Sequence, residues 1–185
     1  MPQETEDLIY GGRVRIRQPA RGYRVNADTI LLAAAAEIAS DAQRVVELGC
    51  GVGAALLAVA QRAELGDARF TGVERDADMA ALARRNVAAN NLESRMEIIV
   101  ADAVDPPDSL SDALSGFDAV LFNPPYAAPG EGRAPAPARQ AAHVGEHPIE
   151  AWVRVWCNRM RAGATMTLIH RADKLGEILR ALEGR

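Results

Sequence analysis

Short apolar segments alternate with amphipathic segments from residue 44 to the end of the chain, and this alternation limits the possible folds more than any other feature. Segments such as 96–100 (Met-Glu-Ile-Ile-Val) and 119–122 (Ala-Val-Leu-Phe) are apolar almost throughout. Strands of this kind are typical of parallel sheets, in which right-handed crossover helices cover both faces. We therefore predict an α/β fold with a doubly wound, mostly parallel sheet.

The same pattern locates the individual elements. It predicts strands at 44–48, 69–74, 96–100, 118–122 and 164–169, and helices at 53–64, 77–90, 109–115, 148–161 and 173–183. Ahead of them, arginine alternates with Val14 and Ile16, which predicts a half-buried or edge strand over residues 11–17. Asn26 as an N-cap, followed by Asp28 in the first turn, predicts a helix that runs to about residue 39.

Length and composition favour a single domain over residues 1–185, with an N-terminal strand and helix in 1–40 and the sheet in 44–185. Of the 185 residues, 49% are hydrophobic, which is enough for one core without disulfides. Cys50 and Cys157 have no disulfide-framework or metal-ligand spacing, so a reducing, cytoplasmic location fits and no metal is expected. No segment has the pattern of a membrane span or an N-terminal targeting signal.

A glycine-rich turn follows the predicted strand 44–48. Gly49, Cys50, Gly51 and Gly53 lead into a helix, and Glu47 lies just before them. Such a turn lets backbone amides approach a pyrophosphate or the carboxylate of an amino-acid cofactor, although it can also be an ordinary strand-to-helix connection. The Gly-x-Gly-x-Gly spacing and the charge of Glu47, which would repel a pyrophosphate, favour S-adenosylmethionine as the ligand.

Two carboxylates follow at the ends of the next two predicted strands. Glu74, with Arg75 after it, has the position expected for a group that binds the ribose hydroxyls of an adenosine. Asp102, followed by Ala103, is placed to accept a hydrogen bond from the adenine amino group. The order of glycine turn, second-strand acid and third-strand acid resembles the class I S-adenosylmethionine-dependent methyltransferases over about residues 44–125.

The tetrapeptide Asn123-Pro124-Pro125-Tyr126 directly follows the predicted strand 118–122, at the edge where open α/β sheets bind ligands. An aromatic or amide NH2 is a poor nucleophile, so a catalyst needs acceptors for its two hydrogens. The Asn123 side-chain oxygen and the Pro124 carbonyl could supply them, Pro125 would stiffen the turn, and Tyr126 would stack on a planar substrate. The alternative is a rigid turn that only ends a strand. The tetrapeptide resembles the motif of methyltransferases that act on adenine N6, guanine N2 or protein glutamine.

The N-terminal region carries a narrower resemblance. Residues 11–19 and 22–28, together with 167–171, resemble bacterial tRNA (adenine-N6)-methyltransferases that act near the anticodon of a valine tRNA. This resemblance implies that Tyr23, Asn26 and Asp28 help to enclose the methionine end of the cofactor. It also implies an RNA substrate, in which a base in a single-stranded loop can be unstacked at low cost.

Basic residues are concentrated near the N-terminus, although the whole chain has a net charge of −4. Five arginines without an intervening acid lie at Arg13, Arg15, Arg17, Arg21 and Arg24. With Arg133 and Arg139 they are candidate contacts to RNA phosphates. A solvated edge strand is an equally good interpretation of the N-terminal arginines.

Residues 127–147 form a long segment rich in Pro, Gly and Ala, and we expect a mobile loop that gates the substrate. His143, His147 and His170 have no common ligand spacing, so we expect them at the surface or in a hydrogen bond at a strand end.

Methyltransferases of this class normally end in a further strand hairpin, and nothing follows Arg185. We therefore expect an uncovered sheet edge, a monomer or weak dimer, and a chain that is truncated or naturally short.

The leading hypothesis is a methyltransferase that acts on adenine N6 in tRNA. The alternatives are methylation of protein glutamine N5 or rRNA guanine N2, and a module that binds the cofactor or RNA without catalysis.

Overall fold

The computed structural model describes residues 3–22, 24–62, 65–126 and 147–184. Its centre is a five-stranded sheet in the order β5-β4-β3-β6-β7, in which every neighbouring pair is parallel. The strands are β3 (Arg44–Leu48), β4 (Arg69–Glu74), β5 (Met96–Val100), β6 (Phe117–Phe122) and β7 (Met160–Leu168). The prediction of a doubly wound parallel sheet is confirmed.

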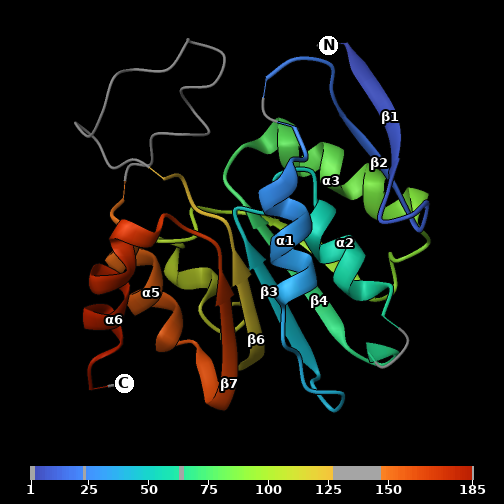
Figure 1. Cartoon of the computed structure of the whole chain (residues 1–185). Coiled ribbons are helices and arrows are strands. Elements are labelled where there is room, and N and C mark those ends of the chain that lie inside the picture. The colour runs from blue at the N-terminus through green and yellow to red at the C-terminus, as the bar shows by residue number, and fades with distance from the viewer. Residues whose placement is uncertain (1–2, 23, 63–64, 127–146, 185) are drawn as a thin grey trace.

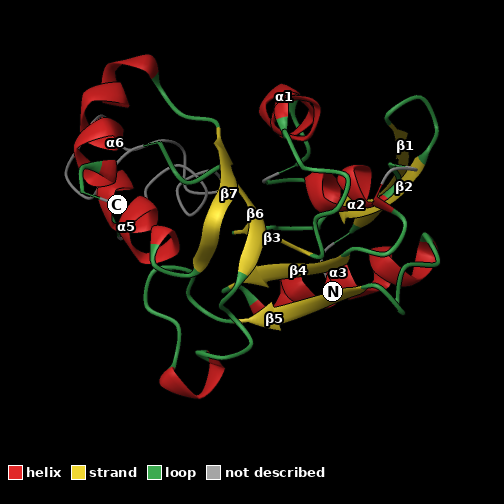
Figure 2. Cartoon of the chain, turned by 90° about the horizontal axis from the view of Figure 1, so that it is seen from below, coloured by secondary structure: helices red, strands yellow, loops and turns green. Residues whose placement is uncertain are grey.

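Helices cover both faces of this sheet (Figures 1 and 2). The helices α1 (Ala27–Ala35), α2 (Ala54–Ala60) and α3 (Ala77–Ala89) pack on one face. On the other face lie α5 (Ile149–Cys157) and α6 (Leu175–Leu182). The strand order reverses direction between β3 and β6, which is the place where ligands bind in sheets of this type.

Several predicted boundaries need correction. The helix expected at 53–64 is α2 and ends at Ala60, and the short helix expected at 109–115 is only the 3-10 turn η2 (Asp108–Leu110). The last predicted strand begins earlier than expected, at Met160, because β7 pairs with β6 through a register shift. A further 3-10 turn, η3 (Ala172–Lys174), precedes α6.

The N-terminal region contains two strands where the sequence pattern predicted one. β1 (Glu4–Ile9) pairs antiparallel with β2 (Val14–Pro19) in a separate two-stranded sheet. The segment 4–9 is polar and acidic, so its own pattern predicts no strand, and it extends only because β2 offers it a partner. Val14 and Ile16 of β2 are fully buried against the core, as the alternation predicted.

Two asparagine side chains, Asn86 of α3 and its C-cap residue Asn90, attach β2 to the rest of the molecule. The Asn86 amide accepts a hydrogen bond from the Arg17 backbone N–H (2.8 Å) and donates to the Arg17 carbonyl (2.9 Å). One turn later, Asn90 makes the same pair of bonds to Arg15 at 3.0 and 2.7 Å. Side-chain amides therefore satisfy an edge of β2 that has no neighbouring strand in the described part of the chain.

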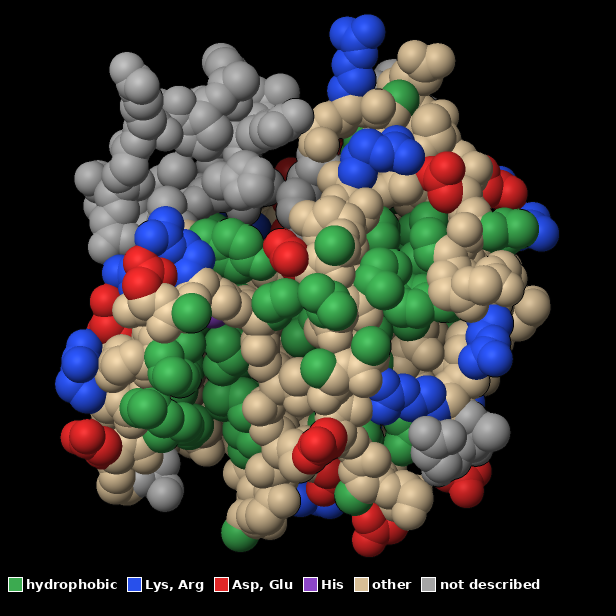
Figure 3. Space-filling model, viewed as in Figure 1, with side chains coloured by type: hydrophobic (Ala, Val, Ile, Leu, Met, Phe, Trp, Pro, Cys, Tyr) green, Lys and Arg blue, Asp and Glu red, His purple; other side chains and the backbone are tan. Residues whose placement is uncertain are grey.

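The far end of the sheet keeps apolar surface exposed. β7 is the last strand, with a parallel neighbour on one side only among the described residues. On the adjacent α6, Leu175, Leu179 and Leu182 are 55%, 55% and 38% exposed, and Figure 3 shows apolar side chains over α6 and β7. Among the described residues, this edge of the sheet therefore has no strand beyond β7.

Candidate active site

The glycine turn after β3 has a backbone that other residues rarely adopt. Gly49, Gly51 and Gly53 have φ angles of 63°, 54° and 82°. The turn is closed by hydrogen bonds from the Cys50 N–H to the Val73 carbonyl (3.0 Å) and from the Gly53 N–H to the Cys50 carbonyl (2.8 Å). Positive φ at three alternate positions explains why glycine is required at each of them.

Glu74 at the end of β4 holds this turn in place. One carboxylate oxygen accepts from the Gly51 N–H (2.8 Å) and the other from the Asp76 N–H (2.9 Å). A carboxylate oxygen can accept more than one hydrogen bond, so both oxygens of Glu74 retain capacity for a ligand hydroxyl. The predicted ribose-binding residue is thus beside the glycine turn, although the prediction did not include its bond to the turn.

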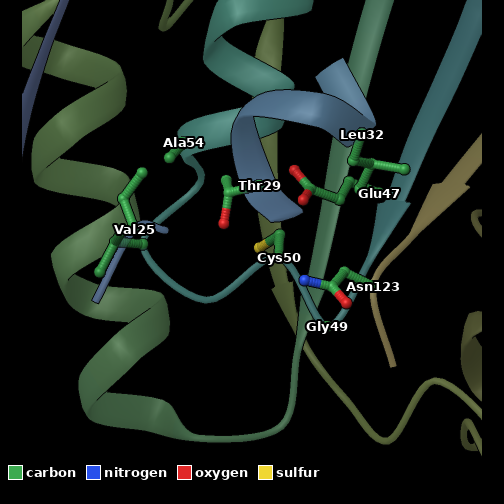
Figure 4. Close-up of a pocket in the computed structure, with 9 residues that line it drawn as sticks. Val25, Thr29, Leu32, Glu47, Gly49, Cys50, Ala54 and Asn123 are labelled. Atoms are coloured by element: carbon green, nitrogen blue, oxygen red, sulfur yellow. The ribbon is translucent and has the colours of Figure 1, made fainter. Parts of the chain in front are cut away.

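Glu47 is a buried carboxylic acid directly before the turn, with 5% of its surface exposed. Burial raises its pKa from 4.5 to about 8; the hydrogen bond from the Leu56 N–H (2.8 Å) opposes this rise and the charge of Glu74 adds to it. The carboxylate points into the space between α1 and the glycine turn (Figure 4). A cation bound there would favour the ionised form of this side chain.

A pocket connects these elements with the tetrapeptide after β6 (Figure 4). It contains about 330 Å³ of space, part of it open to solvent. Three groups of residues line it: Val25, Thr29 and Leu32 from the α1 region, Glu47, Gly49, Cys50, Val52 and Ala54 from the turn, and Asn123 from the end of β6. Cys50 is buried, which raises the pKa of its thiol and keeps it protonated.

The tetrapeptide begins at the pocket wall. Asn123 is half-buried, and its side-chain amide has no hydrogen-bond partner among the described residues. Pro124 is buried. Tyr126 donates a hydrogen bond from its hydroxyl to the Asp28 carboxylate (2.7 Å), so the tetrapeptide is tied to the first turn of α1. Asn26 is the N-cap of α1, as predicted, and accepts from the Thr29 N–H (3.2 Å).

Asp102 and Ala103 follow β5 and already have partners. One Asp102 oxygen accepts from the Val104 N–H (2.7 Å), and the other lies 3.5 Å from His147 Nε2. Partial burial raises the pKa of Asp102, but these contacts outweigh it and leave the pKa below its ordinary value. The Ala103 carbonyl accepts from the Trp156 indole N–H (2.7 Å). Binding of an adenine amino group by Asp102 therefore remains a prediction, with His147 as a neighbour that the sequence did not reveal.

Most of the described N-terminal arginines are paired with acids of β1. Glu6 lies 3.5 Å from Arg15 and 3.0 Å from Arg17, and Asp7 lies 3.0 Å from Arg24. Figure 3 accordingly shows acidic and basic side chains interspersed near this hairpin. The region is therefore less basic than residues 13–24 alone indicate.

The remaining predicted residues are distributed as follows. Arg13, Arg21 and Arg75 are exposed. Tyr23, Arg133, Arg139 and His143 lie outside the described residues, as does the predicted loop apart from His147. Sequence reasoning did not name Val25, Thr29 and Leu32 as pocket residues, although for Thr29 and Leu32 the inner face of the predicted helix was a usable signal. It also gave no role to His170, which lies at the end of β7 against Tyr126.

Within the described ranges, no group of three or more His, Cys, Asp or Glu side chains is placed to hold a metal ion. None of the helices described is long and apolar enough to cross a membrane.

Comparison with known proteins gives matches at three levels. Residues 45–142 match a family described as a methyltransferase domain. A tRNA1(Val) (adenine(37)-N6)-methyltransferase of Shewanella amazonensis is 36% identical over 126 residues, which are 67% of this chain and 50% of that protein. A release factor glutamine methyltransferase of Chlorobaculum tepidum is 35% identical over 96 residues, 51% of this chain and 31% of that protein.

A crystal structure provides the third level. A predicted O-methyltransferase of Agrobacterium tumefaciens is 32% identical, with a TM-score of 0.62 over 85% of this chain and 68% of that one. The chain spans about half the length of the curated relatives that it matches, for example 50% and 40% of two of them. The matched segment 45–142 begins in β3, contains the glycine turn, Glu74 and Asp102, and continues past the tetrapeptide. The chain therefore belongs to the methyltransferase domain family.

Proposed function

We propose that this protein transfers a methyl group from S-adenosylmethionine to an exocyclic amino nitrogen, and that its substrate is adenine N6 in tRNA. The observation that carries the proposal is the position of Asn123. Its amide has no partner among the described residues, and it lines the same pocket as Gly49 and Glu47. An unused acceptor beside the predicted cofactor turn is what methylation of an amino group requires.

The residues around the pocket are chemically suited to S-adenosylmethionine. Its amino-acid end would lie against the backbone of the glycine turn and the buried carboxylate of Glu47, near Asp28 of α1. Its ribose hydroxyls would be accepted by Glu74 and its adenine by Asp102. When bound, the cofactor supplies an electrophilic methyl group on a positively charged sulfur.

The chain's own residues then have two tasks. The Asn123 side-chain oxygen and the Pro124 carbonyl accept the two hydrogens of the substrate amino group, which directs the nitrogen lone pair toward the methyl group. Positive charge that develops on the nitrogen is stabilised by the same two acceptors. Tyr126 holds the plane of the base. No strong general base is needed before transfer, because the amino group loses its proton after it becomes a cation.

Support for an RNA substrate comes from the named activity of the relatives and from the chemistry of the tetrapeptide. A base in a structured RNA must be unstacked to enter the pocket, and this is cheapest in a loop. The ion pairs of Glu6 reduce the charge that Arg15 and Arg17 can offer to phosphates. We therefore expect Arg13 and Arg21, which are exposed, to contribute more to RNA binding.

The experiment is a labelled-methyl assay on separate fractions of total tRNA, rRNA and ribosome-free protein. The proposal expects label in tRNA that nuclease digestion releases as N6-methyladenosine. Asn123→Ala should abolish transfer and leave cofactor binding measurable, whereas Gly51→Asp should abolish cofactor binding. Transfer by Asn123→Ala at the parental rate would show that the assigned catalytic role is wrong.

Methylation of protein glutamine is the second candidate, because the Chlorobaculum relative bears that name and is 35% identical over 96 residues. Label that is resistant to nuclease and sensitive to protease would favour it, and label recovered as N2-methylguanosine from rRNA would favour a guanine target. Cofactor binding without transfer to any fraction would indicate a non-catalytic module.

A further inference from the structure

His170 lies beside the tetrapeptide because of the register between β6 and β7. These strands are parallel, with Phe122 opposite Leu168, and the Ile169 N–H continues the ladder by donating to the Phe122 carbonyl (3.2 Å). One residue further along, His170 is therefore at the level of the prolines. Both segments leave the sheet at its carboxyl edge, where the pocket is.

The imidazole of His170 makes two contacts with the tetrapeptide. Its ring meets the Tyr126 ring edge-on, with 5.4 Å between the centroids and 77° between the planes. The ring also interacts with the backbone carbonyl of Pro125. His170 is half-buried, and its buried Nδ1 has no hydrogen-bond partner within the described part of the chain. A histidine with one buried nitrogen unsatisfied is costly to keep for packing alone.

Tyr126 is thus contacted by two residues from opposite ends of the chain. Asp28 of α1 fixes the hydroxyl through the 2.7 Å hydrogen bond, and His170 after β7 fixes the edge of the ring. A tyrosine ring has two side-chain torsions, and a hydroxyl contact together with an edge contact restrains both of them. The plane of the ring is set before any substrate enters.

We propose that His170 is a positioning residue, which together with Asp28 holds Tyr126 and the Pro125 peptide in the orientation that receives the substrate base. The inference rests on the proposed function, since it names a supporting residue for the same site. His170 does not contact the reacting atoms in this role. Its effect passes through Tyr126, so it should disappear when Tyr126 is removed.

The test is a double-mutant cycle in single-turnover methyl transfer to total tRNA. His170→Ala should lower the rate constant by roughly 10- to 100-fold, because displacement of a stacking platform by about 1 Å can cost that much. The Kd for S-adenosylmethionine, measured separately, should stay within about twofold, because the cofactor turn is untouched. In a Tyr126→Ala background, His170→Ala should change the rate by less than about twofold.

Further variants separate positioning from folding. His170→Gln can restore a donor near the Pro125 carbonyl and should recover part of the rate, which a general loss of stability would not predict. Asp173→Ala, an exposed change on the same segment, is the matched control and should leave the rate within about twofold. Multiplicative effects of His170→Ala and Tyr126→Ala, or an equal loss in the control, would overturn the inference.

A substrate-independent measurement distinguishes failure of this inference from failure of the proposed function. In protein labelled at tyrosine rings, the NMR signal of Tyr126 can be assigned by its absence from Tyr126→Phe. His170→Ala should shift that signal and leave the signal of Tyr10 in place. An unchanged Tyr126 signal would overturn the inference even if tRNA is methylated, and a shifted signal would support it even if tRNA is not the substrate.

Discussion

Ionisation of Glu47 should make the stability of the cofactor-free protein strongly dependent on pH. In the folded protein burial raises the pKa of Glu47 to about 8, whereas an unfolded chain restores it to about 4.5. Between these two values the folded state holds a proton that the unfolded state has lost. Stability contributed by neutral Glu47 is therefore fully present below about pH 4.5, and it decreases as the pH rises toward 8.

The magnitude follows from the same two pKa values. Each pH unit between them costs about 1.4 kcal/mol, so ionisation of Glu47 should remove roughly 4 to 5 kcal/mol in total. This is a large part of the roughly 5 to 15 kcal/mol that stabilises a typical domain.

The perturbation is Glu47→Gln, which keeps an oxygen for the Leu56 N–H and removes the ionisation. The free energy of unfolding should be measured with urea for both proteins at about pH 5, 7 and 8.5 without ligand. Comparison of the two proteins cancels groups common to both, including His170, whose pKa burial lowers. The stability of the parent relative to Glu47→Gln should fall by about 4 kcal/mol over this range. A difference that changes by less than about 1 kcal/mol would refute the assignment of a raised pKa.

Three further outcomes are expected. Gly72→Ala would place a methyl carbon 2.7 Å from the Ile98 side chain and should lower stability by about 1 to 3 kcal/mol, measurable as a lower melting temperature. Asn86→Ala would leave the peptide groups of Arg17 unpaired on this edge of β2 and should cost about 2 to 4 kcal/mol in urea unfolding, so an effect below about 0.5 kcal/mol would contradict the role of its amide. Glu6→Gln should free two arginines and strengthen binding of tRNA, with a steeper dependence on salt concentration. Weaker or unchanged binding would show that the hairpin does not contact RNA.

Features encoded locally were predictable from the sequence. The strands of the main sheet, the glycine turn and the Asn26 cap depend on residues that are neighbours in the chain, so a periodic pattern or a short motif identifies them. The order of acids after successive strands also indicates that Glu74 lies near the glycine turn, because parallel strands end at one edge of the sheet.

Features that depend on pairing between distant segments were not predictable. The acidic segment of β1 becomes a strand only against β2, and its register brings Glu6 opposite Arg17. The contact of His170 with Tyr126 depends on the alignment of β6 with β7, which no single segment encodes. In both cases the sequence shows the side chain but not its partner.

The link between Asn86, Asn90 and β2 has a geometric consequence for how the N-terminal region can vary. Four residues of a helix rise about 6 Å, and two residues of a strand span about 6.6 Å, so the amides of Asn86 and of the C-cap Asn90 match the peptides of Arg17 and Arg15. The rise over four helical residues is thus close to the length of two strand residues. Insertions in the turn at Gly11 and Gly12 would leave this match intact. One residue added between Arg15 and Arg17 would put the peptides out of step with the amides and turn alternate side chains of β2 to the opposite face.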